Sequence, residues 1–145
     1  MLRTDICDRL GIEYPILLAG MGGVSMHQLT AAVSNAGGLG VLGGATVDGE
    51  RLRREIRQTR ELTDKPFAVN LNLFPAMRPL DNREYMEVIY QEGIKIVETS
   101  GHRAPEELAK DLKEHGVTLV HKCVGVRYAL KAQSVGVDAV TVVGF

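Results

Sequence analysis

The chain has 145 residues, of which 45% are hydrophobic and 24% are charged, and its formal net charge is −1. This length and composition predict one globular domain with a sizeable core, and they exclude a disordered or fibrous protein. The charge argues against a nucleic-acid binder and no apolar run is long enough to span a bilayer, so we expect a cytoplasmic protein that binds neither nucleic acid nor membrane.

The N-terminal third contains two short apolar runs that each end in glycines, within residues 14–25 and 35–45. Backbone without side chains lets a flat or charged ligand approach closely, and it equally lets a helix pack tightly on a strand. The spacing leaves both interpretations open. Neither run is a GxGxxG followed by an acidic residue at the spacing of a dinucleotide-binding fold, so that fingerprint is not supported.

Six apolar runs of four to six residues alternate with segments of helical period, and we expect each run to be a buried strand. They lie at residues 16–19, 39–42, 67–71, 94–98, 118–121 and 139–143. Ser25 and Asp48 are expected N-caps of two of the helices between them. The helix that follows Asp48 is rich in arginine, and we expect a solvated face whose acidic partners are Glu50, Glu55 and Glu61.

This repeat of strand and helix predicts right-handed parallel crossovers and therefore an α/β protein. Two architectures fit, an open doubly wound sheet and a TIM-type barrel. A full eight-unit barrel needs about 250 residues, so six units would form an incomplete barrel. The chain stops directly after the last expected strand, and from this we expect a fragment of a longer protein.

Polar residues stand at the ends of two expected strands. Period two places Asn70 and Asn72 on one face among apolar neighbours, where each amide needs a hydrogen-bonding partner, either backbone or a polar ligand. Lys122 ends a later strand. Residues 74–80, with two prolines, are expected to form a loop over the strand ends.

The cysteines and histidines give no metal-binding pattern. Cys7 and Cys123 lie in no CxxC or Cys/His cluster, so we expect reduced core thiols and no metal site. None of the four histidines is expected to be a catalytic base. His115 fits the end of a helix, and His121 alternates with Lys122 and so faces the opposite side, between sheet and helices.

Six blocks of the sequence, taken in order, resemble the nitronate monooxygenase family, formerly called 2-nitropropane dioxygenase. The blocks are PILLAGMGGV at 15–24, AVSNAGGLG at 32–40, LTDKPFAVNL at 62–71, IVETSG at 96–101, VHKC at 120–123 and GVDAV at 136–140. The resemblance implies an FMN-dependent (β/α)8 TIM barrel of roughly twice this length. Residues 1–145 would be the N-terminal part of its single FMN-binding domain and would supply about six βα units.

The resemblance also assigns cofactor contacts to residues of this chain. The cofactor-binding residues it implies are Gly20, Met21, Gly22, Asn70, Asn72 and Lys122. The backbone of the first three would lie against the isoalloxazine ring, the two asparagines would hydrogen-bond the flavin, and the lysine would stabilise negative charge at the pyrimidine edge. The catalytic histidine and the phosphate-binding loops would come after Phe145, so no catalytic residue is assigned here.

The activity that the resemblance implies for the parent protein is oxidation of an alkyl nitronate with FMN and molecular oxygen to a carbonyl compound and nitrite. Two other flavin activities on the same scaffold remain open, an NAD(P)H:quinone oxidoreductase and an enoyl-acyl-carrier-protein reductase. The partners would be small molecules, namely a nitronate, or a quinone with NAD(P)H. An alternative outside the enzymes also remains open, namely that the chain is a non-catalytic fragment that associates with its missing half or with a second copy as a homo-oligomer.

Overall fold

The computed structural model describes residues 3–73, 82–101 and 103–144. Five strands form one sheet in which every neighbouring pair is parallel. The strands are β1 (Gly40–Gly43), β2 (Phe67–Asn72), β3 (Ile96–Ser100), β4 (Thr118–Cys123) and β5 (Ala139–Val142). Their spatial order is their sequence order, without the reversal that defines a doubly wound sheet, so the fold is part of a barrel.

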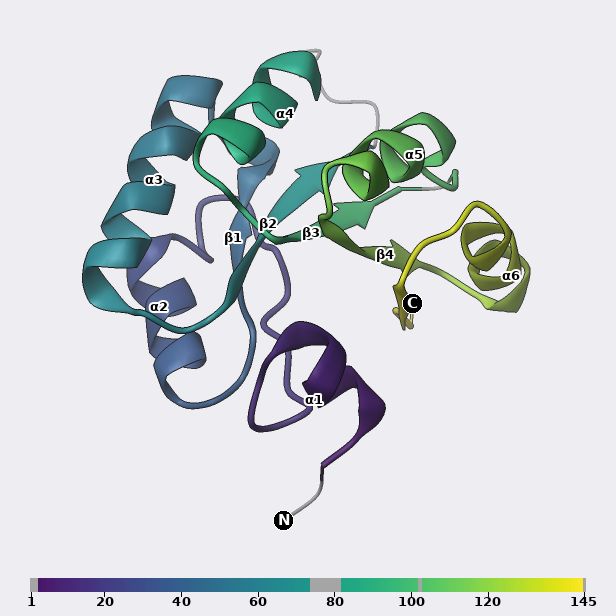
Figure 1. The fold of residues 1–145 in the computed structure, drawn as a ribbon, viewed down its shortest axis with the longest axis horizontal. Coiled ribbons are helices and arrows are strands. Elements are labelled where there is room, and N and C mark those ends of the chain that lie inside the picture. Colours follow the sequence, from purple (N-terminus) through teal and green to yellow (C-terminus); the bar gives the residue numbers. More distant parts are fainter. Residues whose placement is uncertain (1–2, 74–81, 102, 145) are drawn as a thin grey trace.

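Helices flank the strands, and all but the first of those described cover one face of the sheet (Figure 1). They are α1 (Asp5–Leu10), α2 (His27–Asn35), α3 (Gly49–Leu62), α4 (Asn82–Gln91), α5 (Glu106–Glu114) and α6 (Val126–Ser134), with a 3₁₀ turn η1 (Gly44–Thr46) after β1. Figure 1 shows α2 to α6 along an arc outside the sheet, with α1 apart from them on the open side. We call the face under the arc the outer face and the opposite one the inner face.

Each face of the sheet has its own apolar core. The outer core joins the sheet to helices α3, α4 and α5, and its buried residues include Leu42, Val69, Val97, Leu119, Ile56, Ile89 and Leu112. The inner core is smaller and is closed by α1 and the residues after it, with Cys7, Leu10, Ile12, Val41, Ala68, Ile96 and Val120. Because inner-core residues occupy the first halves of the strands, α1 covers the amino-terminal end of the barrel interior.

Two local expectations were wrong, and one helix was not predicted. The first expected strand, 16–19, forms a single parallel bridge between Leu17 and Leu39. Helix α1 was not expected, because three of its six residues are charged and its buried residues Cys7 and Leu10 pack on residues of the inner core that are distant in sequence. Ser25 does not cap α2, whose N-cap is Met26 without a side-chain hydrogen bond. The other five expected strands are present with ends shifted by at most two residues.

Helix α3 begins as expected, since Asp48 caps it by accepting a hydrogen bond from the Arg51 N–H at 2.8 Å. The acidic partners of its arginines were only partly predicted. Glu50 and Glu55 each pair with one arginine, at 3.7 and 3.8 Å, whereas Glu61 pairs with none in the described part of the chain. Glu92, the residue after α4, binds three arginines of α3, and no local spacing predicts a partner 32 to 39 residues away.

Both cysteines are reduced and buried, as predicted for core thiols. Within residues 3–73, 82–101 and 103–144, no helix combines the length and the apolar character needed to cross a bilayer. The expected loop over the strand ends, 74–80, lies outside the described residues.

Candidate functional site

Residues 19–25 form a turn that packs on the carboxyl end of β1. The Ser25 hydroxyl accepts a hydrogen bond from the Met21 N–H at 2.7 Å and donates one to the Met21 carbonyl at 3.0 Å. The Gly43 N–H then donates to the Ser25 carbonyl at 2.9 Å. The Ser25 side chain therefore closes this turn, which explains why it is not used as the cap of α2.

Gly20 and Gly22 allow this turn to lie close to its neighbours. A Cβ atom on Gly20 would stand 2.4 Å from the Cβ of Asn70, and one on Gly22 would stand 2.6 Å from the Cγ2 of Thr46. The space without a side chain is thus filled by protein, which favours the packing interpretation of these glycines on that side. Met21 is 38% exposed, so a ligand would meet this backbone from the solvent side.

Four polar side chains meet on the inner face at the carboxyl edge of the sheet, and we call them the strand-end cluster: Asn70 on β2, Glu98 and Ser100 on β3, and Lys122 on β4. Asn70 is in register with Glu98, and Ser100 with Lys122, so all four point to the same face. The Asn70 Nδ2 donates to Glu98 Oε2 at 2.7 Å and to Ser100 Oγ at 3.0 Å.

An ion pair lies at the centre of the strand-end cluster. The Lys122 Nζ stands 3.2 Å from Glu98 Oε2, and the two side chains are only 15% and 6% exposed. Removing both charges from water is costly, and the pair is stabilised because Asn70 donates a further hydrogen bond to the same carboxylate oxygen. The cluster therefore presents a fixed ammonium and a fixed amide with little net charge.

The structure brings three of the six predicted cofactor residues into contact or near contact, namely Gly20, Asn70 and, through Glu98, Lys122. Asn72 lies two residues beyond Asn70 on the same face and is half-buried. Glu98 and Ser100 were not predicted as site residues. The period of two that identified Asn70 and Asn72 on β2 also places Glu98 and Ser100 on one face of β3.

The described histidines lie elsewhere. His121 is buried on the outer face, as expected, where its Nδ1 is 2.9 Å from Thr99 Oγ1, and burial lowers its pKa. The His27 ring nitrogen Nδ1 pairs with Glu55 at 2.7 Å at the start of α2. His115 follows α5 and stacks on Tyr90 with 3.8 Å between the ring centroids. His102 is outside the described residues.

The chemistry of the strand-end cluster suits an organic ligand better than a metal ion. Among the described residues, no three side chains of His, Cys, Asp or Glu gather as a metal site would require. The ammonium of Lys122, the amide of Asn70 and the hydroxyl of Ser100 are instead hydrogen-bonding groups on one face. They are complementary to a flat ring edge that carries carbonyl oxygens and a ring N–H.

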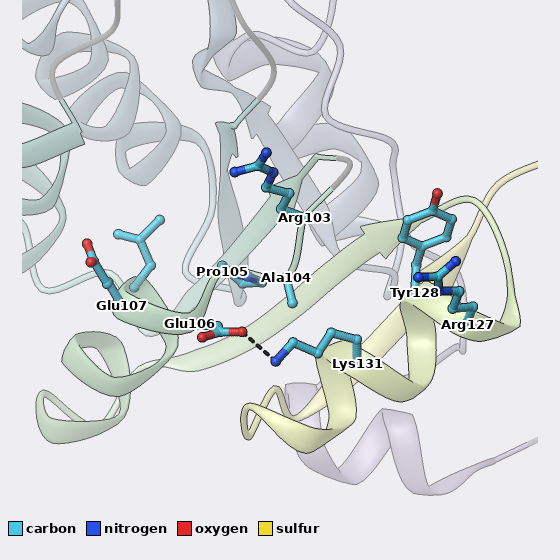
Figure 2. Close-up of a pocket in the computed structure, with 9 residues that line it drawn as sticks. Arg103, Ala104, Pro105, Glu106, Glu107, Arg127, Tyr128 and Lys131 are labelled. Carbon is cyan, nitrogen blue, oxygen red and sulfur yellow. Dashed lines mark ion pairs between the residues drawn. The ribbon is translucent and has the colours of Figure 1, made fainter.

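A cavity of about 680 Å³ opens at the same edge of the sheet, between the first turns of α5 and α6. Figure 2 shows Arg103, Arg127, Tyr128 and Lys131 around it. Its two loops follow β3 and β4 directly, so they continue from Ser100 and Lys122 of the strand-end cluster.

Comparison with known proteins places the chain among oxidoreductases. It is 35% identical over 144 residues to (3aS,4S,5R,7aS)-5-hydroxy-7a-methyl-1-oxo-octahydro-1H-indene-4-carboxyl-CoA dehydrogenase of Mycobacterium tuberculosis. The aligned region covers 99% of this chain and 39% of the dehydrogenase. A nitronate monooxygenase of Paraburkholderia phytofirmans is 55% identical over 62 residues, 43% of this chain and 17% of that protein. The chain thus spans well under half the length of these relatives.

The solved structures agree with the assignment of a partial barrel. FabK from Thermotoga maritima superposes with a TM-score of 0.90 at 34% identity, over 98% of this chain and 44% of FabK. The model of the family described as nitronate monooxygenase matches residues 3–145. From the family match, the parallel strand order and the superposition together, we conclude that the chain belongs to the nitronate monooxygenase family.

Proposed function

We propose that the whole protein is an FMN-dependent oxidoreductase that oxidises alkyl nitronates with molecular oxygen, forming a carbonyl compound and nitrite. Residues 1–145 would be the N-terminal part of its single FMN-binding barrel domain. The observation that carries the proposal is the strand-end cluster, because it holds the Lys122 ammonium and the Asn70 amide at the carboxyl edge of the strands, where barrel enzymes keep their sites.

The residues present fit a flavin. Its pyrimidine edge offers the acceptors N1, O2 and O4 and the donor N3–H, and Asn70, Ser100 and Lys122 supply matching groups from one face. The exposed side of the backbone at Met21 and Gly22 would lie beside the ring. Bound FMN would supply the electron acceptor for the nitronate carbanion.

Glu98 gives the cluster its order in this proposal. Its carboxylate holds both the Lys122 ammonium and the Asn70 amide, so both groups are fixed before any ligand arrives. It also balances the lysine charge, so stabilisation of negative charge at the ring edge would come from the oriented N–H groups of Lys122 more than from an uncompensated cation. The catalytic base would come from beyond Phe145, as the resemblance implies.

The full-length parent provides the test. We expect the purified protein to release one equivalent of FMN, and we expect a nitronate to reduce it anaerobically faster than NADH does. Faster reduction by NADH would favour the NAD(P)H:quinone oxidoreductase or the enoyl-acyl-carrier-protein reductase instead. Absence of flavin from a folded full-length protein would refute every flavin enzyme among these alternatives.

The variant Glu98→Gln tests the role of the cluster without measuring turnover. We expect it to weaken FMN binding about tenfold, since it frees Lys122 and replaces one acceptor oxygen by a competing donor. Thr99→Val is the matched control on the same strand, because it removes one neutral hydrogen bond, to His121 on the outer face, and we expect a change in FMN affinity of about threefold or less. Equal FMN affinity in wild type and Glu98→Gln would contradict the assigned role.

A second candidate function is oxidation of a coenzyme A thioester. The observation that favours it is coverage, since the CoA dehydrogenase aligns over 99% of this chain while the nitronate monooxygenase of Paraburkholderia phytofirmans aligns over 43%. Anaerobic mixing of the full-length protein with an acyl-CoA would distinguish the two candidates by which substrate reduces the flavin.

The two open edges of the described sheet favour a further possibility for residues 1–145 alone. Strand β5 pairs with β4 on one side and has no neighbour on its other side in the described part of the chain. Its residues Val140 and Val142 are 41% and 60% exposed, and Val126 and Leu130 of α6 are 76% and 60% exposed. A chain with this surface would associate with the rest of its barrel or with a second copy as a homo-oligomer. Sedimentation of the 145-residue chain tests this, and a monomer at all concentrations would contradict it.

We also propose a cytoplasmic location. Both cysteines are reduced and buried, and no disulfide stabilises the described part of the chain. Free thiols of this kind suit a reducing compartment. Fractionation of the source cells checks this directly.

A further inference from the structure

The cavity between α5 and α6 is large enough for a ligand of its own. Its volume of about 680 Å³ lies within the range of ligand pockets, roughly 300–1,000 Å³. Arg103 comes three residues after Ser100, and an extended chain spans at most about 3.6 Å per residue, so the two Cα atoms are within about 11 Å. The wall of the cavity at Arg103 therefore lies within about 11 Å of the end of β3, measured between Cα atoms.

Three basic and two acidic side chains line the cavity. Arg103 and Arg127 are exposed, and neither forms an ion pair with a described residue. Lys131 is already neutralised by Glu106, whose Oε1 is 2.5 Å from its Nζ. Glu107 also lines the cavity, but Figure 2 shows it on the far side of the α5 N-terminus from Arg127 and Tyr128. Two guanidinium groups thus remain available to an anion.

An aromatic ring completes the wall. Tyr128 is 42% exposed and stands beside Arg127 at the start of α6 in Figure 2. A partly exposed tyrosine offers a face on which a nucleobase can stack, and guanidinium forks bind phosphate oxygens two at a time. Phosphates and an aromatic base within one ligand would satisfy all three side chains.

We propose that this cavity binds a phosphorylated adenosine ligand, with Arg103 and Arg127 on its phosphates and the Tyr128 ring on its adenine. A coenzyme A thioester and NADPH share this chemistry, since each carries a diphosphate and a further phosphate on the adenosine ribose. The proposal rests on the proposed function only for the other end of the ligand, which extends to the strand-end cluster as substrate or as reductant.

Titration calorimetry on the 145-residue chain at low salt tests the cavity without any flavin. The probes are coenzyme A and NADP⁺, with NAD⁺ as the matched dinucleotide that lacks the ribose phosphate. We expect at least one of the two probes to bind at least about tenfold more tightly than NAD⁺, and we expect its affinity to fall as salt is added. Binding of coenzyme A alone identifies a substrate tail, binding of NADP⁺ alone identifies a reductant, and binding of both supports the shared chemistry.

Variants place the ligand in the cavity. Arg103→Gln and Arg127→Gln should each weaken binding about tenfold, and Tyr128→Ala about fivefold, whereas Tyr128→Phe should bind as wild type. Arg54→Gln is the matched control, an exposed arginine of α3 outside the cavity, and should leave affinity unchanged. Circular dichroism of each variant verifies folding.

Two results would overturn the proposal. The first is that neither probe binds more tightly than NAD⁺, and the second is that binding survives the double variant Arg103→Gln, Arg127→Gln in a folded chain. The flavin content of the full-length protein is measured separately, so failure of the cavity and failure of the proposed oxidoreductase are distinguishable.

Discussion

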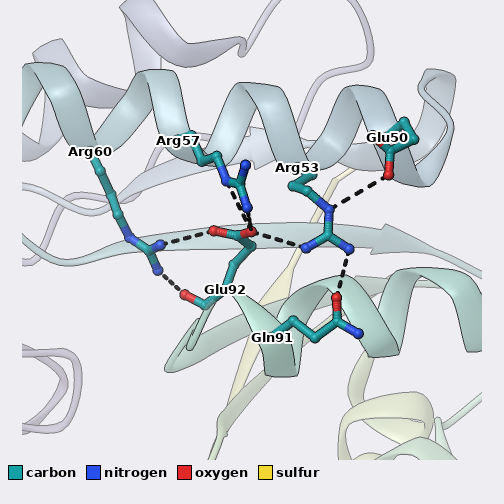
Figure 3. A network of polar contacts seen from close by, with 6 residues as sticks. All are labelled: Glu50, Arg53, Arg57, Arg60, Gln91 and Glu92. Carbon is teal, nitrogen blue, oxygen red and sulfur yellow. Dashed lines mark hydrogen bonds and ion pairs between the residues drawn. The ribbon is translucent and has the colours of Figure 1, made fainter.

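Glu92 is the carboxylate on which the contact between α3 and α4 depends. Figure 3 shows Arg53, Arg57 and Arg60, from successive turns of α3, converging on it. Its oxygens accept from Arg53 Nη1 at 3.0 Å, Arg57 Nη2 at 2.8 Å and Arg60 Nη1 at 3.3 Å, and its side chain is 8% exposed. Arg60 also donates to the Glu92 carbonyl.

The variant Glu92→Gln removes the charge and keeps the shape. Breaking a fully buried ion pair costs about 3–5 kcal/mol. Arg57 and Arg60 are 62% and 42% exposed and can turn to water. We therefore expect a smaller loss, about 2 kcal/mol, in the free energy of unfolding. For a domain of this size that corresponds to a fall in Tm of about 7 °C.

Urea unfolding of the 145-residue chain, followed by circular dichroism because the protein has no tryptophan, measures this loss. The control is Glu50→Gln, which removes a 76% exposed carboxylate 3.7 Å from Arg53 and should change stability by less than about 0.5 kcal/mol. If both variants unfold at the same urea concentration, the buried network does not stabilise the helix pair and the reasoning fails.

The pH dependence of the same difference gives a second check. Burial acts to raise the pKa of Glu92, but hydrogen bonds and charges from Arg57 and Arg53 outweigh it, so the net pKa is lowered from 4.5. A carboxyl whose folded pKa is lowered stabilises the fold above its unfolded pKa, and this is lost as pH falls through the folded value. The gap between wild type and Glu92→Gln should be constant from pH 8 to about 5.5 and should shrink below about 4.5.

Three further predictions concern other parts of the fold. Gly40→Ala would place a Cβ 2.0 Å from the Thr30 carbonyl of α2 and should cost about 2 kcal/mol by urea unfolding, and an unchanged midpoint would contradict the close packing of α2 on β1. Asp48→Ala removes the cap of α3 and should cost about 1 kcal/mol in the same assay, with no change expected if the cap is not formed in solution. Burial lowers the pKa of His121, so as the pH falls the unfolded chain takes up a proton at this residue before the folded chain does. The wild-type chain should therefore lose stability between about pH 7 and 5.5, and His121→Gln should lose less. Urea midpoints of both proteins at the two pH values measure the difference.

Local patterns predicted most of the secondary structure. Strands β1 to β5 follow from apolar runs, and the cap at Asp48 follows from its position before a helical segment, because these signals depend on neighbours in sequence. The first expected strand shows where such signals are insufficient. Residues 16–19 have the composition of a strand, but the turn at Met21 to Ser25 draws the chain away after one bridge at Leu17.

The strand-end cluster was half predicted for a similar reason. Period two placed Asn70 and Asn72 on one face and His121 on the face opposite Lys122, and both inferences depend only on strand geometry. Glu98 was not identified as the partner of Asn70 and Lys122, because the register between strands sets which residue of β3 stands beside Asn70.

The sequence by itself determined the class of the fold, the alternation of strands and helices, and the face on which each polar strand residue lies, because these depend on periods of 2 and 3.6 along one chain. The resemblance also implied a barrel, and its sequential strand order is confirmed. The tertiary structure alone decided the pairing of Glu98 with Lys122, the binding of three arginines to Glu92 and the cavity between α5 and α6. Each of these joins residues from separate elements, and the packing of whole helices and strands, which no local pattern records, sets the distance between them.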